Sequence, residues 1–138
     1  MKRVFLGGTC NNSKWRENLI SKLDLNSIEY FNPVVEDWTK ECMEIEKQER
    51  QTCDFCLYTI TPKMTGVYSI AEVVDDSNKR PKKTILCILI QDESEEFNKS
   101  QLKSLNQVGE MVKENGGQVF NNLDDVANFL NKAGNDTF

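Results

Sequence analysis

Blocks of apolar and polar positions alternate along this chain in a pattern that predicts strands and helices in regular succession. Short apolar runs are typical of buried strands, and apolar residues three and four positions apart are typical of amphipathic helices. Strands are predicted over residues 3–7, 27–31, 54–60, 84–90 and 118–120. Helices are predicted over residues 13–23, 39–52, 66–76, 97–114 and 123–132, the first of them capped by Ser13.

Alternation of strand and helix is the pattern of a parallel sheet that is covered by helices on both faces. We therefore expect one doubly wound, flavodoxin-like α/β domain over residues 1–133, followed by a loose tail over residues 134–138. Right-handed crossovers leave few topologies, and we choose strand order 2-1-3-4-5. Its switch point lies between strands one and three, so the loops after Gly7 and Ile60 should lie side by side.

The segment that follows the third predicted strand is the strongest candidate for a functional site. It leads from Ile60 through Gly66, Tyr68 and Ser69 to Glu72, which falls in the first turns of the next helix. A carboxylate at that position can act as a nucleophile on a sugar carbon. The simpler alternative is that Glu72 lies on the exposed side of its helix.

The glycines at the end of the first predicted strand form a second candidate. Gly7, Gly8 and Thr9 would let a ligand approach the backbone next to the start of a helix. The segment lacks the third glycine of the dinucleotide-binding fingerprint, so that class of cofactor site is not expected. A plain turn between strand and helix is an equally good interpretation.

Polar residues also follow the second predicted strand. Asn32, Pro33 and Asp37 would either form a polar loop or line one wall of a pocket, and Trp38 would either pack on a helix or stack on a flat base. Asp54, at the start of the third predicted strand, is either a turn residue or a group that hydrogen-bonds to a leaving base.

The composition favours a soluble globular protein and gives little support for a polymeric nucleic-acid partner. The chain has 138 residues, 28% of them charged, and a formal net charge of −5. It contains no histidine, so acid/base chemistry near neutrality must come from Asp, Glu, Cys, Lys or Tyr. We see neither a signal peptide nor an apolar run of membrane-spanning length, and we expect a cytoplasmic protein that does not interact with membranes.

The five cysteines do not form a recognisable metal-binding pattern. Cys53 and Cys56 are spaced as Cys-x-x-Cys, but no second pair of ligands follows at a matching spacing. Cys56 and Cys87 lie in apolar runs, which is typical of buried free thiols in a reducing compartment. We therefore expect neither a metal nor a cofactor.

Several of these segments together resemble the nucleoside 2-deoxyribosyltransferase-like family. The resemblance covers about two thirds of the chain and is carried by residues 5–9, 31–33, 53–62 and 66–72. The most specific part is the stretch from Gly66 to Glu72. The resemblance implies a small-molecule nucleoside or nucleotide as the partner, and a homo-oligomer.

In that family, a glutamate at the position of Glu72 attacks the anomeric carbon of a 2′-deoxynucleoside and forms a covalent deoxyribosyl-enzyme. The resemblance implies that Asp54 helps to position the base and supply a proton, and that the loop of Gly7, Gly8 and Thr9 frames the sugar and base. This chain departs from some members at Gly66, where those members carry an aspartate.

Three functions are open at this point. The first is transfer of a (deoxy)nucleoside's sugar to another base through a covalent intermediate on Glu72. The second is hydrolysis of a deoxynucleoside 5′-monophosphate, with Ser13, Ser69 and helix N-terminal amides holding the phosphate. The third is a non-catalytic nucleotide-binding module.

Overall fold

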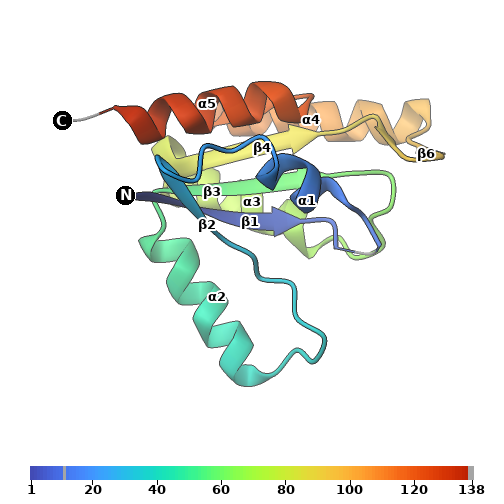
Figure 1. Ribbon diagram of the computed structural model, residues 1–138. Coiled ribbons are helices and arrows are strands. Elements are labelled where there is room, and N and C mark those ends of the chain that lie inside the picture. Colours follow the sequence, from blue (N-terminus) through green and yellow to red (C-terminus); the bar gives the residue numbers. More distant parts are fainter. Residues whose placement is uncertain (11, 137–138) are drawn as a thin grey trace.

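The central sheet has the predicted strand order. The computed structural model describes residues 1–10 and 12–136, and its main sheet is β2-β1-β3-β4-β7 with every pair of neighbours parallel (Figure 1). Its strands are β1 (Lys2–Gly8), β2 (Ile28–Phe31), β3 (Phe55–Ile60), β4 (Thr84–Ile88) and β7 (Gln118–Phe120). Because β7 is the fifth predicted strand, the order 2-1-3-4-5 and the flavodoxin-like fold are confirmed.

Helices connect the strands and cover both faces of the sheet (Figure 1). They are α1 (Trp15–Ile20), α2 (Lys40–Thr52), α3 (Tyr68–Lys79), α4 (Lys99–Asn115) and α5 (Leu123–Asn135), with a short 3-10 turn at Pro81–Lys83 before β4. Helices α1 and α5 lie against each other, as do α3 and α4. This pairing is what a doubly wound crossover pattern produces.

The two faces of the sheet have separate hydrophobic cores. Side chains alternate across a strand, so Leu6 and Phe5 point to opposite faces. Leu6 packs with Trp15 of α1 and Leu130 of α5, whereas Phe5 packs in the cluster that contains Val73 of α3. The apolar runs of the sequence therefore fix which helix covers which face.

Helix α2 differs from the other helices because none of its residues is buried. In Figure 1 it extends away from the sheet instead of lying flat on it. Thr39 caps the helix by accepting a hydrogen bond from the Cys42 N–H, and Glu49 pairs with Arg3 of β1 at 3.0 Å. Polar contacts, more than apolar burial, hold this helix in place.

The first helix is shorter than predicted, and Ser13 has a different role. Helix α1 begins at Trp15 and ends at Ile20, with Lys14 at its N-cap. Ser13 Oγ accepts only a long hydrogen bond from the Trp15 N–H at 3.4 Å. The Ser13 hydroxyl donates to Asp92 Oδ2 at 2.5 Å, and Thr61 Oγ1 donates to the same oxygen at 2.7 Å. Asp92 belongs to a small hairpin of β5 (Gln91–Asp92) and β6 (Glu95–Glu96), which the sequence pattern did not predict.

The last helix is longer than predicted. It runs to Asn135 instead of Lys132, so Gly134 and Asn135 belong to α5 and not to a loose tail. Asn135 Oδ1 lies 2.5 Å from the Ser27 hydroxyl, a contact that ties the end of the helix to the segment before β2. Residues 137–138 of the expected tail lie outside the described residues.

The cysteines in the apolar runs are buried free thiols, as predicted. Burial raises the pKa of both Cys56 and Cys87 to about 12, so these thiols are protonated and inert near neutrality. Within residues 1–10 and 12–136, no three Cys, Asp or Glu side chains are grouped so that they could hold a metal ion. In the same part of the chain, no helix is both long and apolar enough to cross a membrane.

Candidate functional site

A cavity of about 700 Å³ opens at the carboxyl ends of β1 and β3. Its walls come from the loops after β1, β2 and β3 and from helices α1, α2 and α3. The size is within the range of pockets for small ligands. The predicted site residues that line it are Gly7, Gly8, Thr9, Pro33, Trp38, Gly66, Tyr68, Ser69 and Glu72.

The loops after β1 and β3 lie side by side, as the switch-point prediction required. The Thr9 N–H donates to the Thr59 carbonyl at 2.9 Å, and the Thr61 N–H donates to Thr9 Oγ1 at 3.0 Å. Gly8 adopts φ +112°, and a Cβ at this position would lie 2.1 Å from the Thr59 carbonyl oxygen. Only glycine allows this close approach.

Arg16 binds the backbone of the same loop and was not among the predicted site residues. Its guanidinium donates to the carbonyls of Leu6, Gly8 and Thr9 at 2.9, 3.2 and 2.7 Å. The residue is only 5% exposed, and burial lowers the pKa of Arg16 to about 10, so it is still charged near neutrality. A positive charge therefore lies in the cavity wall next to the Gly7–Thr9 loop.

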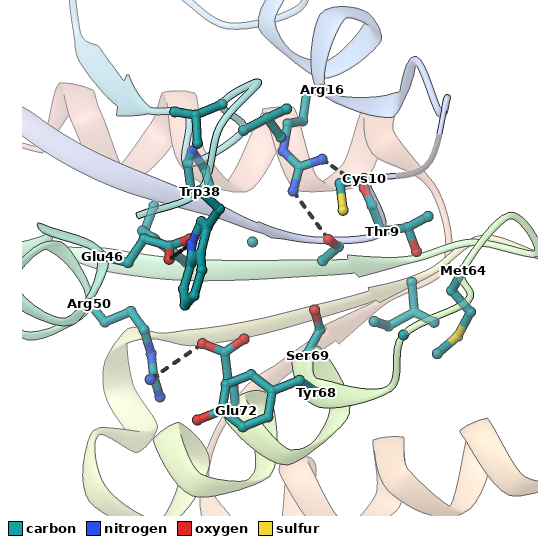
Figure 2. A pocket seen from close by; sticks show the side chains of 18 of the residues that line it. Thr9, Cys10, Arg16, Trp38, Glu46, Arg50, Met64, Tyr68, Ser69 and Glu72 are labelled. Carbon is teal, nitrogen blue, oxygen red and sulfur yellow. Dashed lines mark hydrogen bonds and ion pairs between the residues drawn. The ribbon is translucent and has the colours of Figure 1, made fainter. Parts of the chain in front are cut away.

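Glu72 points from α3 into the cavity, where it meets Arg50 of α2 (Figure 2). The distance from Arg50 Nη1 to Glu72 Oε2 is 3.3 Å, and the Glu72 side chain is 20% exposed. Burial raises the pKa of Glu72 to about 7, an effect that Arg50 opposes and that the charges of Glu46 and Asp76 reinforce. Glu72 thus changes charge near neutral pH, which is typical of catalytic carboxylates.

A buried network fixes Arg50. Arg50 Nη2 donates to Asp76 Oδ1 at 2.8 Å, and Arg50 Nε donates to the Tyr58 hydroxyl at 2.9 Å. Asp76 is fully buried and also accepts hydrogen bonds from the Tyr58 hydroxyl and from Arg80. Burial lowers the pKa of Arg50, but the hydrogen bond and charge of Asp76 outweigh this and raise it above its usual range. Arg50 is therefore a permanent, well-oriented cation beside Glu72.

Trp38 forms part of the opposite wall. Its indole N–H donates to Glu46 Oε2 at 2.9 Å, and the residue is 56% exposed (Figure 2). An indole that is anchored at its nitrogen and open on its face can stack on a flat ligand ring. Glu46 lines the cavity as well, so the polar partner of the indole is also part of the site.

Three predicted site residues do not line the cavity. Asn32 Oδ1 accepts from the Val34 N–H at 3.0 Å in a local turn, and Asp37 is exposed in the same loop. Asp54 lies at the amino end of β3, where its Oδ2 accepts from the Arg3 N–H at 2.9 Å. The cavity is at the carboxyl end of this strand, about 20 Å farther along at the usual rise per residue.

This position corrects the expected role of Asp54. A carboxylate that is hydrogen-bonded to the backbone at the far edge of the sheet cannot contact a base beside Glu72. The physical reason is the direction of the strand, because only its carboxyl end opens into the crevice of a doubly wound sheet.

A simple signal in the sequence points to Arg50 and Asp76, which were not among the predicted site residues. Glu46 and Arg50 are four residues apart on one helix, and Glu72 and Asp76 are four residues apart on another. Residues at this spacing lie on the same face of a helix. Arg50 carries the charge that complements both Glu72 and Asp76, which is compatible with two helix faces that meet across the cavity.

A comparison with known families supports the resemblance. The family model described as nucleoside 2-deoxyribosyltransferase like matches residues 1–90. The chain belongs to this family. The matched part of the chain ends just past β4 and includes Arg50 and Glu72. No curated protein and no solved structure gives a significant match to the chain.

Proposed function

We propose that this protein cleaves the N-glycosidic bond of a 2′-deoxynucleoside through a covalent deoxyribosyl–Glu72 intermediate and transfers the sugar to a second base. The observation that carries this proposal is the Glu72 carboxylate, which faces the cavity and has the fixed Arg50 cation 3.3 Å away. Family membership supports a nucleoside as the substrate. The chain contains no histidine, so a carboxylate is one of the few side chains that can take part in this chemistry near neutrality.

The chemistry needs a charged carboxylate at the anomeric carbon. As the bond between C1′ and the base nitrogen breaks, positive charge develops on the sugar, and an adjacent carboxylate stabilises it and then bonds to C1′. Arg50 opposes the effect of burial and so keeps a larger share of Glu72 ionised. The exposed face of Trp38 offers a stacking surface for the base.

Base exchange tests this function directly. Incubation with 2′-deoxyinosine and adenine should give 2′-deoxyadenosine and hypoxanthine, and Glu72→Gln should abolish both products while keeping a cooperative unfolding transition. Glu44→Gln is a matched control, because Glu44 is exposed on α2 and does not line the cavity. Intact-protein mass spectrometry during turnover should find a deoxyribosyl adduct on the wild type only. Full activity of Glu72→Gln would refute the assignment.

Hydrolysis of a deoxynucleoside 5′-monophosphate is a second candidate, and Arg16 favours it. The guanidinium lies in the cavity wall, and none of the ion pairs within the described residues includes it. A phosphate would supply the missing negative charge. Ser13, proposed earlier as a phosphate ligand, already donates to Asp92.

The same assay separates the candidates. A hydrolase would release free base from the 5′-monophosphate and give no exchange product. A non-catalytic binding module would be stabilised by the ligand against thermal unfolding and would form no product with any substrate.

A further inference from the structure

We propose that Glu46 is the acid/base residue of the site: it protonates the leaving base and later takes a proton from the incoming base. This inference rests on the proposed function and adds to it the group that handles the proton. The need for such a group follows from the position of Asp54, which is too far from the cavity to act, and from the glycine at position 66.

Few acidic groups can reach a substrate in this cavity. Among the residues that the structure describes, the carboxylates that line it are Glu46 and Glu72. Asp76 is fully buried behind Arg50 and already accepts hydrogen bonds from three side chains. If Glu72 is the nucleophile, Glu46 is the carboxyl group left for proton transfer.

The geometry of α2 directs Glu46 toward the same space as Glu72. Glu46 precedes Arg50 by one helical turn, so both side chains lie on one face of α2. Arg50 contacts Glu72, and Glu46 contacts Trp38 on the opposite wall. Figure 2 shows the Glu46 carboxylate beside the Trp38 indole, with Glu72 reaching into the site from α3.

The bond to Trp38 fixes one oxygen of Glu46 and leaves the other for the substrate. The indole N–H donates to Oε2 at 2.9 Å. A base that stacks on the exposed indole would have its edge near the carboxyl group held at the indole nitrogen. The acid would then lie beside the leaving group and the nucleophile beside the sugar, which is the division of roles that glycosyl transfer needs.

Glu46 and Glu72 are close enough for their charges to interact. The charge of Glu46 contributes, after burial, to the raised pKa of Glu72, so the two groups interact through space. Two neighbouring carboxyl groups disfavour the state in which both are ionised.

The proton balance of the two half-reactions is complete. In the first, the Glu46 carboxyl proton moves to a ring atom of the base, the electron pair of the C1′–N bond stays with the base, and a Glu72 oxygen bonds to C1′. In the second, a ring nitrogen of the incoming base bonds to C1′ and the electron pair of the ester C1′–O bond returns to Glu72. The nitrogen's proton moves to the Glu46 carboxylate.

Two substrates that differ in their need for a proton test this role. 2′-Deoxyinosine must be protonated as its base leaves, whereas 4-nitrophenyl 2-deoxyriboside releases a stable anion. Glu46→Gln should lower kcat/KM for deoxyinosine by about 100-fold or more, and by less than about tenfold for the nitrophenyl substrate. Retained activity on the nitrophenyl substrate also shows that the variant is folded. Glu72→Gln should be inactive on both, and Glu44→Gln should match the wild type.

Each outcome has one meaning. If Glu46→Gln lowered kcat/KM by the same factor for both substrates, the proton-transfer role would be overturned. Full activity of this variant on both substrates would overturn it as well. In either case wild-type turnover would leave the proposed function standing. A wild type that cleaves neither substrate would overturn the proposed function and this inference with it.

Discussion

Arg50 Nη1 lies 3.3 Å from Glu72 Oε2, so α2 supplies the counter-charge of a carboxylate on α3. The other terminal nitrogen of the same guanidinium, Nη2, donates to the buried Asp76 at 2.8 Å. One arginine therefore links the cavity to the core through a helix that has no buried residue of its own. The charge state of Glu72 and the position of α2 should depend on this contact.

Replacing Arg50 should move the pH dependence of catalysis. Activity requires ionised Glu72, so it should rise with pH through the pKa of about 7. Arg50→Met removes the charge that favours the anion, and the rise should move to higher pH by about one unit or more. Arg50→Lys keeps a positive charge and should shift it less. The measurement is kcat/KM for deoxyinosine from about pH 5 to about pH 9.

Removal of a distant cation is the control for this prediction. Lys40→Met changes the net charge equally, but Lys40 is exposed at the start of α2 and does not line the cavity. Identical profiles for the wild type, Arg50→Met and Lys40→Met would show that Arg50 does not set the ionisation of Glu72.

Glu72 should make folding stability depend on pH. Its pKa is raised from 4.5 to about 7 in the folded protein, so between these values the folded state binds more protons than the unfolded state. The contribution of Glu72 to stability is therefore present below about pH 4.5 and is lost as pH rises through about 7. Glu72→Gln should be more stable than the wild type at about pH 8, by on the order of 2 kcal/mol.

Urea unfolding at about pH 5 and about pH 8 measures this effect. The gain from Glu72→Gln should be small at the lower pH and larger at the higher pH. A gain of the same size at both values would mean that the substitution changes packing and not the cost of burying a charge.

The sequence was sufficient for the fold because the relevant signals are local. Apolar runs, helical spacing and glycines at strand ends specify each element, and the alternation of elements then leaves few topologies. The errors are at element ends and in the small hairpin, where single contacts such as the Ser27–Asn135 hydrogen bond decide the outcome.

The candidate site was only partly predictable. Glycines and Glu72 follow strand ends, and the strand order alone brings those ends together. Arg50 and Glu46 belong to α2. The angle of this helix to the sheet is set by side-chain contacts, and residue spacing does not predict that angle. Asp54 was assigned by motif likeness, but it stands at the wrong end of its strand.

Asp76 should be the most important polar residue for stability. Asp76→Ala would leave Arg50 and Arg80 without their shared buried partner and Tyr58 without an acceptor. Breaking a buried ion pair in this way costs about 3–5 kcal/mol. Asp75→Ala is the matched control, because the Asp75 side chain is 46% exposed and should contribute less than about 1 kcal/mol. Urea unfolding of both variants gives the comparison, and equal losses would contradict a special role for the buried network.

Two glycines of the cavity wall should differ strongly in their response to alanine. At Gly8, the φ of +112° already disfavours a side chain, and the new Cβ would lie 2.1 Å from the Thr59 carbonyl oxygen. Since that oxygen belongs to the backbone of β3, it cannot turn aside, and the loop would have to separate from the strand. Gly8→Ala should therefore lower the free energy of unfolding by about 3 kcal/mol or more.

Gly66 lines the same cavity, but a Cβ there would meet nothing within 4 Å. Gly66→Ala should change the free energy of unfolding by less than about 0.5 kcal/mol. Thermal unfolding of both variants tests the pair. Equal stability of Gly8→Ala and Gly66→Ala would show that the close approach of β1 and β3 does not hold the Gly7–Thr9 loop in place. Arg16 alone would then have to fix this wall of the cavity.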